Sequence, residues 1–349
     1  MPSLSPKSPK IFRGSPTYYE QVEGVTFGTN PLDCLSLNLP PLCNYHCNIC
    51  FASGTLDNQV RLAEIKHNSL TPVEYTSIIQ EAKNLGVRHL EISGEGEPDL
   101  PIFRNTLHHI VNQATESGIH TTIFVNGSWL DEHLLKLLQE RNTSLAISIK
   151  YANPEKYDEA VGIKGAYERV MPNIILATRF LGGHTENNGT RIYRLALNST
   201  VLKDNLRDNY LLRSLCEEHD IFFHSSTLIP HGRSEGVLVD VEEQNAISRE
   251  LSDSSIILAD SSSETLGFPV CGTFYFGLGI NYDGEALFDA HADDTRGMIG
   301  NIREIGLVEA IRKQREMRNS FYREGRSSYC PLRDSTYQDF ISCYASERR

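Results

Sequence analysis

Three of the chain's eight cysteines lie close together, as Cys43, Cys47 and Cys50 in the stretch LCNYHCNIC. Thiolates are soft ligands that select zinc, copper(I) and iron–sulfur clusters. In a [4Fe–4S] cluster four cysteines normally serve the four irons, one each. Three cysteines therefore leave one iron for a ligand that the chain does not supply. The spacing C-x3-C-x2-C thus predicts an iron–sulfur cluster with one open corner.

The same triplet allows two other interpretations. With His46 as fourth ligand it would be a Cys3His zinc site. Against zinc, His46 and Cys47 are adjacent and would both have to point into one tetrahedron, and zinc motifs usually place a second ligand pair well downstream. The cysteines could also be inert buried thiols, which the regular spacing argues against. Cys34 and Cys216 fit no pattern, and we expect them to be structural.

A glycine-rich stretch, Gly94-Glu95-Gly96-Glu97-Pro98, follows the second predicted strand. Glycine lets a backbone approach a ligand closely, and carbonyl groups and the Glu97 carboxylate could accept hydrogen bonds from an ammonium group. Asn126 follows the third strand, and Ser148 and Lys150 share one face of the fourth because side chains alternate along a strand. At the carboxyl ends of parallel strands, these groups would face one ligand site.

Residues 37–232, which hold the triplet, the GxGEP stretch one βα unit later and these polar strand ends, resemble the radical SAM (S-adenosylmethionine) family. The resemblance implies that Cys43, Cys47 and Cys50 hold a [4Fe–4S] cluster whose fourth iron is chelated by the amino and carboxylate groups of SAM. It also implies that Ile49 packs near the adenine. The other implied contacts to SAM come from Gly94, Gly96, Glu97, Pro98, Asn126, Ser148 and Lys150. The stretch 194–202 departs from the family, because it lacks the glycine-and-glutamate motif of the fifth strand.

The resemblance also implies a reaction. In that family a reduced cluster gives one electron to SAM, which is cleaved to methionine and a 5′-deoxyadenosyl radical, and the radical removes hydrogen from an unactivated carbon. Protein-bound clusters reach potentials as low as about −700 mV, which suits this step. The implied protein is an enzyme of oxidoreductase, lyase or carbon–carbon bond-forming class, with a reductant partner such as flavodoxin or ferredoxin. The sequence singles out no catalytic acid or base.

The elements that must position these residues alternate regularly. Thr71, Pro72 and Glu74 form a capping box with proline at the first helical position, and Gly86 ends that helix. Further helices are predicted at 103–118, 131–140, 154–160, 166–181 and 206–219. Strands are predicted at 34–40, 87–93, 120–125, 144–150, 194–202 and 220–226. Such alternation predicts a parallel sheet with right-handed crossovers.

Six βα units are too few for a closed eight-stranded barrel, so an open barrel or a doubly wound sheet fits better. With the resemblance, we expect an α/β fold: a partial (β/α)6 barrel of the radical SAM type with a smaller C-terminal α+β extension. The expected domains are an N-terminal arm (1–33, partly disordered), the barrel (34–235), a helix and acidic linker (236–268) and a C-terminal domain (269–349).

The C-terminal domain contains a strand pair around Asp283-Gly284, a tight-turn signal, and a helix near 304–317. It resembles the SPASM/twitch extensions of the family, which bind auxiliary clusters. The usual G-x4-C cysteine is replaced here by Asp289, and the C-x2-C pair after it is broken. The resemblance implies one auxiliary cluster held by Cys271, Asp289, Cys330 and Cys343, with His291 as the substitute for Asp289. In the alternative, the cluster is lost and the scaffold only shapes the pocket.

Composition limits the binding partners and the cellular compartment that we expect for this protein. The formal net charge is −12 with a pI near 5.5, which disfavours binding to phosphate backbones. No stretch is long and apolar enough to span a bilayer, and the N-terminus lacks the apolar region of a signal peptide. Clustered rather than scattered cysteines favour a reducing compartment. We therefore expect a cytoplasmic protein without membrane or nucleic-acid partners.

Three functional hypotheses follow. The leading one is a radical SAM enzyme that acts on a small molecule, such as a sugar, nucleoside or amino-acid derivative in specialised biosynthesis, with the auxiliary cluster as a possible electron acceptor. The short N-terminal arm, which leaves no room for a peptide-recognition domain, favours it over a maturase of a ribosomally made peptide. The third, from another class, is a non-enzymatic zinc or iron–sulfur binding protein.

Overall fold

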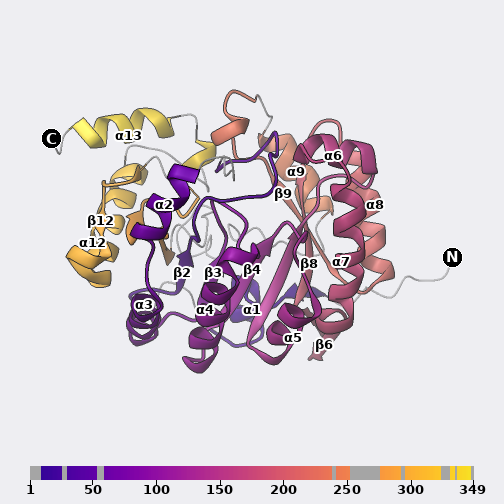
Figure 1. Ribbon diagram of the computed structural model, residues 1–349, viewed down its shortest axis with the longest axis horizontal. Helices are drawn as coiled ribbons and strands as arrows, with labels where there is room; N and C mark the ends of the chain where they lie inside the picture. The colour runs from indigo at the N-terminus through magenta and orange to yellow at the C-terminus, as the bar shows by residue number, and fades with distance from the viewer. Residues whose placement is uncertain are drawn as a thin grey trace.

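A computed structural model describes residues 9–25, 30–52, 59–237, 241–251, 276–291, 295–323, 331–334 and 336–346. Figure 1 shows a curved sheet with helices along its outer side and the C-terminal helices near the strands at one end of the sheet. Within the described residues, nine strands form this sheet, and three short ones form a second sheet.

The strands are β1 (Lys10–Phe12), β2 (Cys34–Leu37), β3 (His89–Ile92), β4 (His120–Val125), β5 (Thr143–Ser148), β6 (His184–Asn187), β7 (Thr190–Tyr193), β8 (Leu195–Val201), β9 (Phe222–Thr227), β10 (Gly277–Ile280), β11 (Glu285–Leu287) and β12 (Gly300–Asn301). The α-helices are α1 (Pro16–Gln21), α2 (Gln59–Asn68), α3 (Pro72–Asn84), α4 (Arg104–Glu116), α5 (Glu132–Glu140), α6 (Pro154–Val161), α7 (Ala166–Leu181), α8 (Leu206–Glu218), α9 (Val241–Leu251), α12 (Ile302–Arg323) and α13 (Tyr337–Ser346).

Six strands form the parallel centre of the sheet, in the order β2-β3-β4-β5-β8-β9. They are the six predicted strands, and β4 occupies the predicted residues 120–125. At the two ends of the nine-stranded sheet lie β9 and β12, and among the described strands these two do not pair with each other. The sheet is therefore an open, partial α/β barrel, as predicted.

Local sequence signals explain why the helices begin and end where they do. In the capping box of α3, Thr71 Oγ1 accepts a hydrogen bond from the Glu74 backbone N–H, and Glu74 Oε2 accepts one from the Thr71 N–H. Gly86, with φ +96°, follows the end of this helix. In α4, the apolar residues at helical spacing form the buried face: Leu107, Ile110, Val111 and Ala114. These helices pack on the strands in one continuous hydrophobic core.

The C-terminal hairpin extends the barrel sheet, which the sequence did not predict. Strand β10 pairs in parallel with β2, from Gly277 opposite Cys34 to Ile280 opposite Leu37. Strands β11 and β12 continue the sheet in antiparallel order. The predicted strand pair around Asp283-Gly284 is confirmed as β10 and β11, and the C-terminal region shares a sheet with the barrel.

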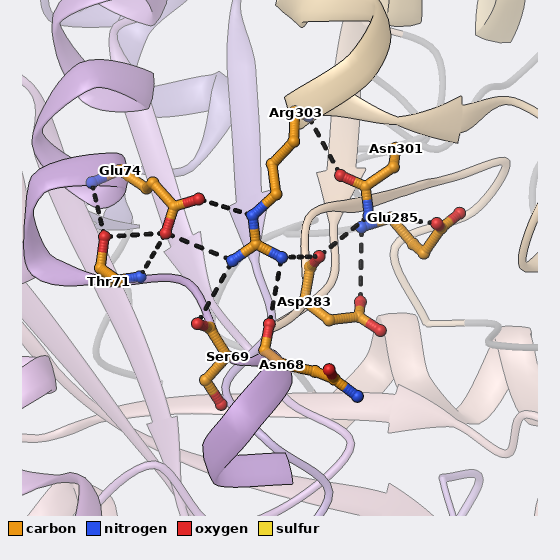
Figure 2. A network of polar contacts seen from close by, with 8 residues as sticks. All are labelled: Asn68, Ser69, Thr71, Glu74, Asp283, Glu285, Asn301 and Arg303. Atoms are coloured by element: carbon orange, nitrogen blue, oxygen red, sulfur yellow. Dashed lines mark hydrogen bonds and ion pairs between the residues drawn. The ribbon is translucent and has the colours of Figure 1, made fainter. Parts of the chain in front are cut away.

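A network of polar contacts also joins the hairpin to the barrel (Figure 2). The Arg303 guanidinium donates to both carboxylate oxygens of Glu74, at 2.5 and 3.2 Å. It also donates to the backbone oxygens of Asn68, Ser69 and Asp283, at 3.1, 3.3 and 2.9 Å. One side chain at the start of α12 therefore holds the end of α2, the cap of α3 and the hairpin turn together.

The N-terminal segment contributes ordered structure that the sequence did not predict. Strand β1 pairs in parallel with β7, which pairs with β6. Phe12 is buried with Ala146, Ala196 and Phe222, on barrel strands. This segment therefore packs against the inner residues of the open barrel. Residues 1–8 lie outside the described part of the chain.

Other expectations have mixed outcomes. Helix α2 and the β6–β7 hairpin were not predicted. Helix α9 is the helix expected after the barrel, while the acidic part of the linker, Cys271 and Cys330 fall outside the described residues. In the part of the chain that the structure describes, no helix is both long and apolar enough to cross a membrane.

Candidate active site

Most of the residues singled out in the sequence meet in one cavity of about 380 Å³ at the carboxyl ends of the central strands. Its lining includes the predicted residues Cys43, Ile49, Cys47, Cys50, Gly94, Gly96, Glu97, Asn126, Ser148, Lys150 and Asp289. Pro98 does not line this cavity, and Cys343 lies exposed on α13. Apart from Asp289, which follows the antiparallel β11, the predicted residues in the lining lie at or after the ends of four parallel strands, β2 to β5, which the topology brings together.

The cysteine loop after β2 is held from two sides. The His46 and Asn48 backbone N–H groups donate to the carbonyls of Val161 and Ala160 at the end of α6, at 2.8 and 3.0 Å. Glu97 N donates to Leu42 O at 2.7 Å, from the loop after β3. The loop's shape is therefore fixed by hydrogen bonds between backbones.

The environment of the thiols bears on metal binding. Burial raises the pKa of Cys43 to about 12, and the Glu97 carboxylate adds to the rise. Burial also raises the pKa of Cys47. Cys43 and Cys47 thus carry protons that iron must displace, so loading of a metal would release protons.

The zinc alternative requires His46 beside the three cysteines. His46 is exposed and is not among the residues that line the cavity. Within the described residues, no three His, Cys, Asp or Glu side chains are placed to share a single metal ion. A cluster does not require such a placement, because each cysteine binds a different iron.

The GxGEP stretch packs directly on the cysteine loop. A methyl group at Gly96 would lie 2.4 Å from Leu42 O and 2.5 Å from Pro40 O. Gly94 forms a bridge with Leu39, and a methyl group there would meet nothing closer than 3.4 Å. Glycine is therefore needed at Gly96 for contact between two backbones, whereas Gly94 faces the cavity.

Glu97 and Asn126 belong to a network that joins three loops. Glu97 Oε2 accepts from Asn126 N at 2.7 Å, and Oε1 accepts from Asp99 N at 3.3 Å. Asn126 Nδ2 donates to Asn44 Oδ1 at 3.0 Å, within the cysteine loop. Burial, followed by the charge of Asp99, raises the pKa of Glu97 to about 8. Both residues thus brace the loops and also line the cavity.

The sequence did not single out Glu91 on β3, and had named His291 only as a spare metal ligand. His291 Nε2 lies 3.6 Å from Glu91 Oε1, and its Nδ1 lies 3.2 Å from Asp289 Oδ1. Although burial opposes the charged imidazolium, the two carboxylates raise the pKa of His291 to about 10. The His291 ring lies edge-on to Phe51, at 5.5 Å between centroids. These side chains, Glu91, Asp289, His291 and Phe51, line the cavity on the side of the C-terminal hairpin.

A further wall of the cavity comes from β8 and β9, and sequence reasoning missed it. Asn198 and His224 are register partners on these strands, and Thr200 and Ser226 are the pair two residues further on. Burial lowers the pKa of His224 to about 4, so its imidazole is neutral at physiological pH. Period-two alternation in 195–201 and 222–227 is the signal that could have placed these polar residues inside the barrel.

Comparison with known proteins agrees with this geometry. The sequence model of the Radical SAM superfamily matches residues 37–186. AdoMet-dependent heme synthase of Methanosarcina barkeri is 26% identical over 209 residues, which are 59% of this chain and 54% of that protein. PqqA peptide cyclase of Rhizobium meliloti is 33% identical over 115 residues, which are 33% of this chain and 29% of that protein. The chain thus spans about half the length of these relatives, or less.

The likeness extends to solved structures. Streptococcus suis SuiB bound to S-adenosylmethionine matches with a TM-score of 0.59 at 15% identity, over 84% of this chain and 68% of that chain. At this identity the match shows the fold alone. The segment matched by the family contains the cysteine triplet, the GxGEP stretch and the polar ends of β4 and β5. Residues 37–186 of this chain are therefore similar in sequence to the Radical SAM superfamily, a family that uses a [4Fe–4S] cluster and S-adenosylmethionine.

Proposed function

We propose that this chain is a radical SAM enzyme whose cluster is held by Cys43, Cys47 and Cys50. The observation that carries the proposal is the convergence of the cysteine loop and the GxGEP stretch on one cavity, with Gly96 in backbone contact with Leu42. When bound, the cluster and SAM would supply a radical able to remove hydrogen from an unactivated carbon. The protein's own residues would bind and orient the cluster and SAM, and they would exclude water from the cavity.

The proposed contacts to SAM follow from the cavity wall. The backbone at Gly94 and Gly96 and the Glu97 carboxyl would face the amino group, and an ammonium there would lower the raised pKa of Glu97. Ser148 and Lys150 lie along the next wall, at the end of β5. Ile49, beside Cys50, offers the apolar surface that an adenine needs.

For the substrate we propose a small molecule. The wall of Asn198, Thr200, His224 and Ser226 offers neutral hydrogen-bonding groups, which suit the hydroxyl and amide groups of a sugar, nucleoside or amino-acid derivative. A second candidate is modification of a peptide, favoured by the 33% identity with PqqA peptide cyclase over 115 residues.

The C-terminal region, 269–349, would be the SPASM/twitch-like part. An auxiliary cluster at Cys271, Asp289, Cys330 and Cys343 remains part of the proposal, as does a flavodoxin or ferredoxin reductant. Asp289 Oδ1 accepts hydrogen bonds from His291 N at 2.9 Å and lies at 3.2 Å from its Nδ1. Binding of a metal by Asp289 would therefore compete with these contacts.

The test is anaerobic reconstitution with counting of iron and sulfide. The wild type is compared with a variant in which Cys43, Cys47 and Cys50 are alanine, and with Cys216→Ala as a control for loss of a buried thiol. We expect the triple variant to lose about four irons per chain, and wild type with dithionite and SAM to release 5′-deoxyadenosine.

Iron that remains in the triple variant would belong to the auxiliary cluster. A wild type that binds about one zinc and no sulfide would contradict the proposal. So would a wild type that loads the triplet with iron yet never cleaves SAM.

A further inference from the structure

A turn far along the chain lies against the cysteine loop. The 3-10 helix η2 (Gly232–Ser234), which follows β9, presents Arg233 to this loop. Arg233 N donates to Cys50 O at 2.8 Å, and its guanidinium Nη1 donates to Cys47 O at 2.9 Å. One residue thus holds the backbone oxygens of two of the three predicted cluster ligands.

The turn itself is closely fitted and rigid. Gly232 has φ +61°, and a methyl group there would lie 2.2 Å from Phe51 O. Buried Ser234 accepts a hydrogen bond from His231 N at 3.2 Å and donates one to Ile229 O at 2.5 Å. Arg233 is therefore placed by a turn that cannot shift without breaking several contacts.

The guanidinium also brings a permanent positive charge next to the thiols. Its Nη1 donates to the Cys47 carbonyl oxygen at 2.9 Å, so the charge lies beside a predicted cluster ligand. Three thiolates and a cluster are a concentration of negative charge, which becomes larger when the cluster is reduced. A nearby cation favours the reduced state, and hydrogen bonding around the sulfurs has the same effect.

We propose that Arg233 is a positioning residue that fixes the Cys47–Cys50 loop and raises the reduction potential of the cluster at the triplet. This inference rests on the proposed function, since it assigns Arg233 a role toward that cluster. It has two separate parts, a mechanical one that exists in the protein without metal and an electrostatic one that appears once the cluster is bound.

The test uses three variants of the full chain. Arg233→Met removes the charge and the hydrogen bond while keeping an apolar stem, and Arg233→Lys keeps the charge. Lys136→Met, on the exposed side of α5, is the control for loss of one charge elsewhere. The cluster's midpoint potential is measured by anaerobic titration followed by electron paramagnetic resonance. Hydrogen exchange of the peptide spanning 42–52 is measured in the metal-free protein.

We expect Arg233→Met to have a more negative midpoint potential and several-fold faster exchange in 42–52. Arg233→Lys should restore most of the potential, and Lys136→Met should match the wild type in both. Equal potentials in all four proteins, or equal losses in the Met and Lys variants, would overturn the electrostatic part. Unchanged exchange in Arg233→Met would overturn the mechanical part. A wild type that takes up no iron would overturn the proposed function and the redox role with it, while the exchange experiment would still decide whether Arg233 holds the loop.

Discussion

At the scale of single residues, Gly96 joins the two motifs that define the site. A methyl group at this position would lie 2.4 Å from Leu42 O and 2.5 Å from Pro40 O, and neither backbone atom can rotate away. We expect Gly96→Ala to lower the free energy of unfolding by about 3 kcal/mol or more, because overpacking against backbone forces the chain itself to move. Thermal unfolding of the metal-free protein and iron content after reconstitution would measure the effect.

Gly94→Ala is the matched control, two residues away in the same motif. The atoms nearest to its methyl group would be Gly96 N and O, at 3.4 Å, which is close to an ordinary contact. We expect this variant to unfold within about 1 kcal/mol of the wild type, and weaker SAM binding in it would then report on the cavity rather than on folding. If both variants unfold alike, the contact of Gly96 with the cysteine loop is not what makes glycine necessary.

The sequence revealed the residues of the site that belong to local motifs. Cys43, Cys47 and Cys50 carry their chemistry in their spacing, and the cavity indeed brings them together with Gly94 and Glu97. The sequence could not reveal that Glu97 accepts a hydrogen bond from the backbone of Asn126, because that contact depends on how the loops after β3 and β4 meet. The role of His291 beside Glu91 was hidden for the same reason: 200 positions separate their numbers, and only folding brings them to 3.6 Å.

At the scale of elements, a turn at Gly14 brings the N-terminal segment into close contact with the barrel strands. Gly14, with φ +95°, sits so close to the barrel that a methyl group would lie 2.6 Å from His120 and 2.9 Å from His89 and Thr122. We expect Gly14→Ala to lower the free energy of unfolding by about 2–4 kcal/mol, because a left-handed backbone strains alanine and the methyl group overpacks the barrel. Urea unfolding, followed by tyrosine fluorescence, would measure this cost.

Gly24→Ala separates the two causes. Gly24 also has a positive φ, +66°, but a methyl group there would meet nothing within 4 Å. We expect Gly24→Ala to lower the free energy of unfolding by about 1 kcal/mol, because only backbone strain acts there. A Gly14→Ala variant no less stable than Gly24→Ala would mean that the segment can withdraw from the barrel without loss.

Elements with strong local signals were predicted, and elements stabilised by distant contacts were not. Helix α3 contains its own capping box, and helix α4 contains its own apolar stripe. Both helices could therefore be predicted from local sequence. Strand β1 has only three residues, and its partner β7 lies about 180 positions later. No local pattern predicts such a pairing, because its stabilisation comes from burial of Phe12 among barrel residues.

At the scale of the whole molecule, the C-terminal region is joined to the barrel by a sheet edge and by a polar network. The sequence placed these residues in a separate domain, since the pattern of alternating strands and helices stops near residue 233. In fact β10 is parallel to β2, the strand that leads into the cysteine loop. The hairpin that carries Asp289 and His291 is thus held in place against the cavity, and its attachment to the barrel bears on the site itself.

The contact between Glu74 and Arg303 (Figure 2) lets this attachment be measured. Hydrogen bonding to Arg303 is the main reason that the pKa of Glu74 lies at about 2. We expect Glu74→Gln to lower the free energy of unfolding at neutral pH by about 1 kcal/mol, since partly exposed ion pairs are screened by solvent. The control is Glu309→Gln, which breaks an ion pair with Arg312 within the part of α12 that follows its kink at Gly306 and should have little effect.

The dependence on pH identifies the charge as the cause. The pKa of Glu74 is depressed in the folded state, so its contribution is complete above the ordinary value of 4.5 and disappears as the pH falls through about 2. The difference between wild type and Glu74→Gln should therefore be largest at neutral pH and shrink steadily in urea titrations below pH 4.5. A difference that stays constant over this range would show that the charge of Glu74 is not the cause. A difference that shrinks would show that the charge of Glu74, whose main partner is Arg303 across the α3–α12 contact, helps to fasten the C-terminal hairpin, and with it one wall of the cavity, to the barrel.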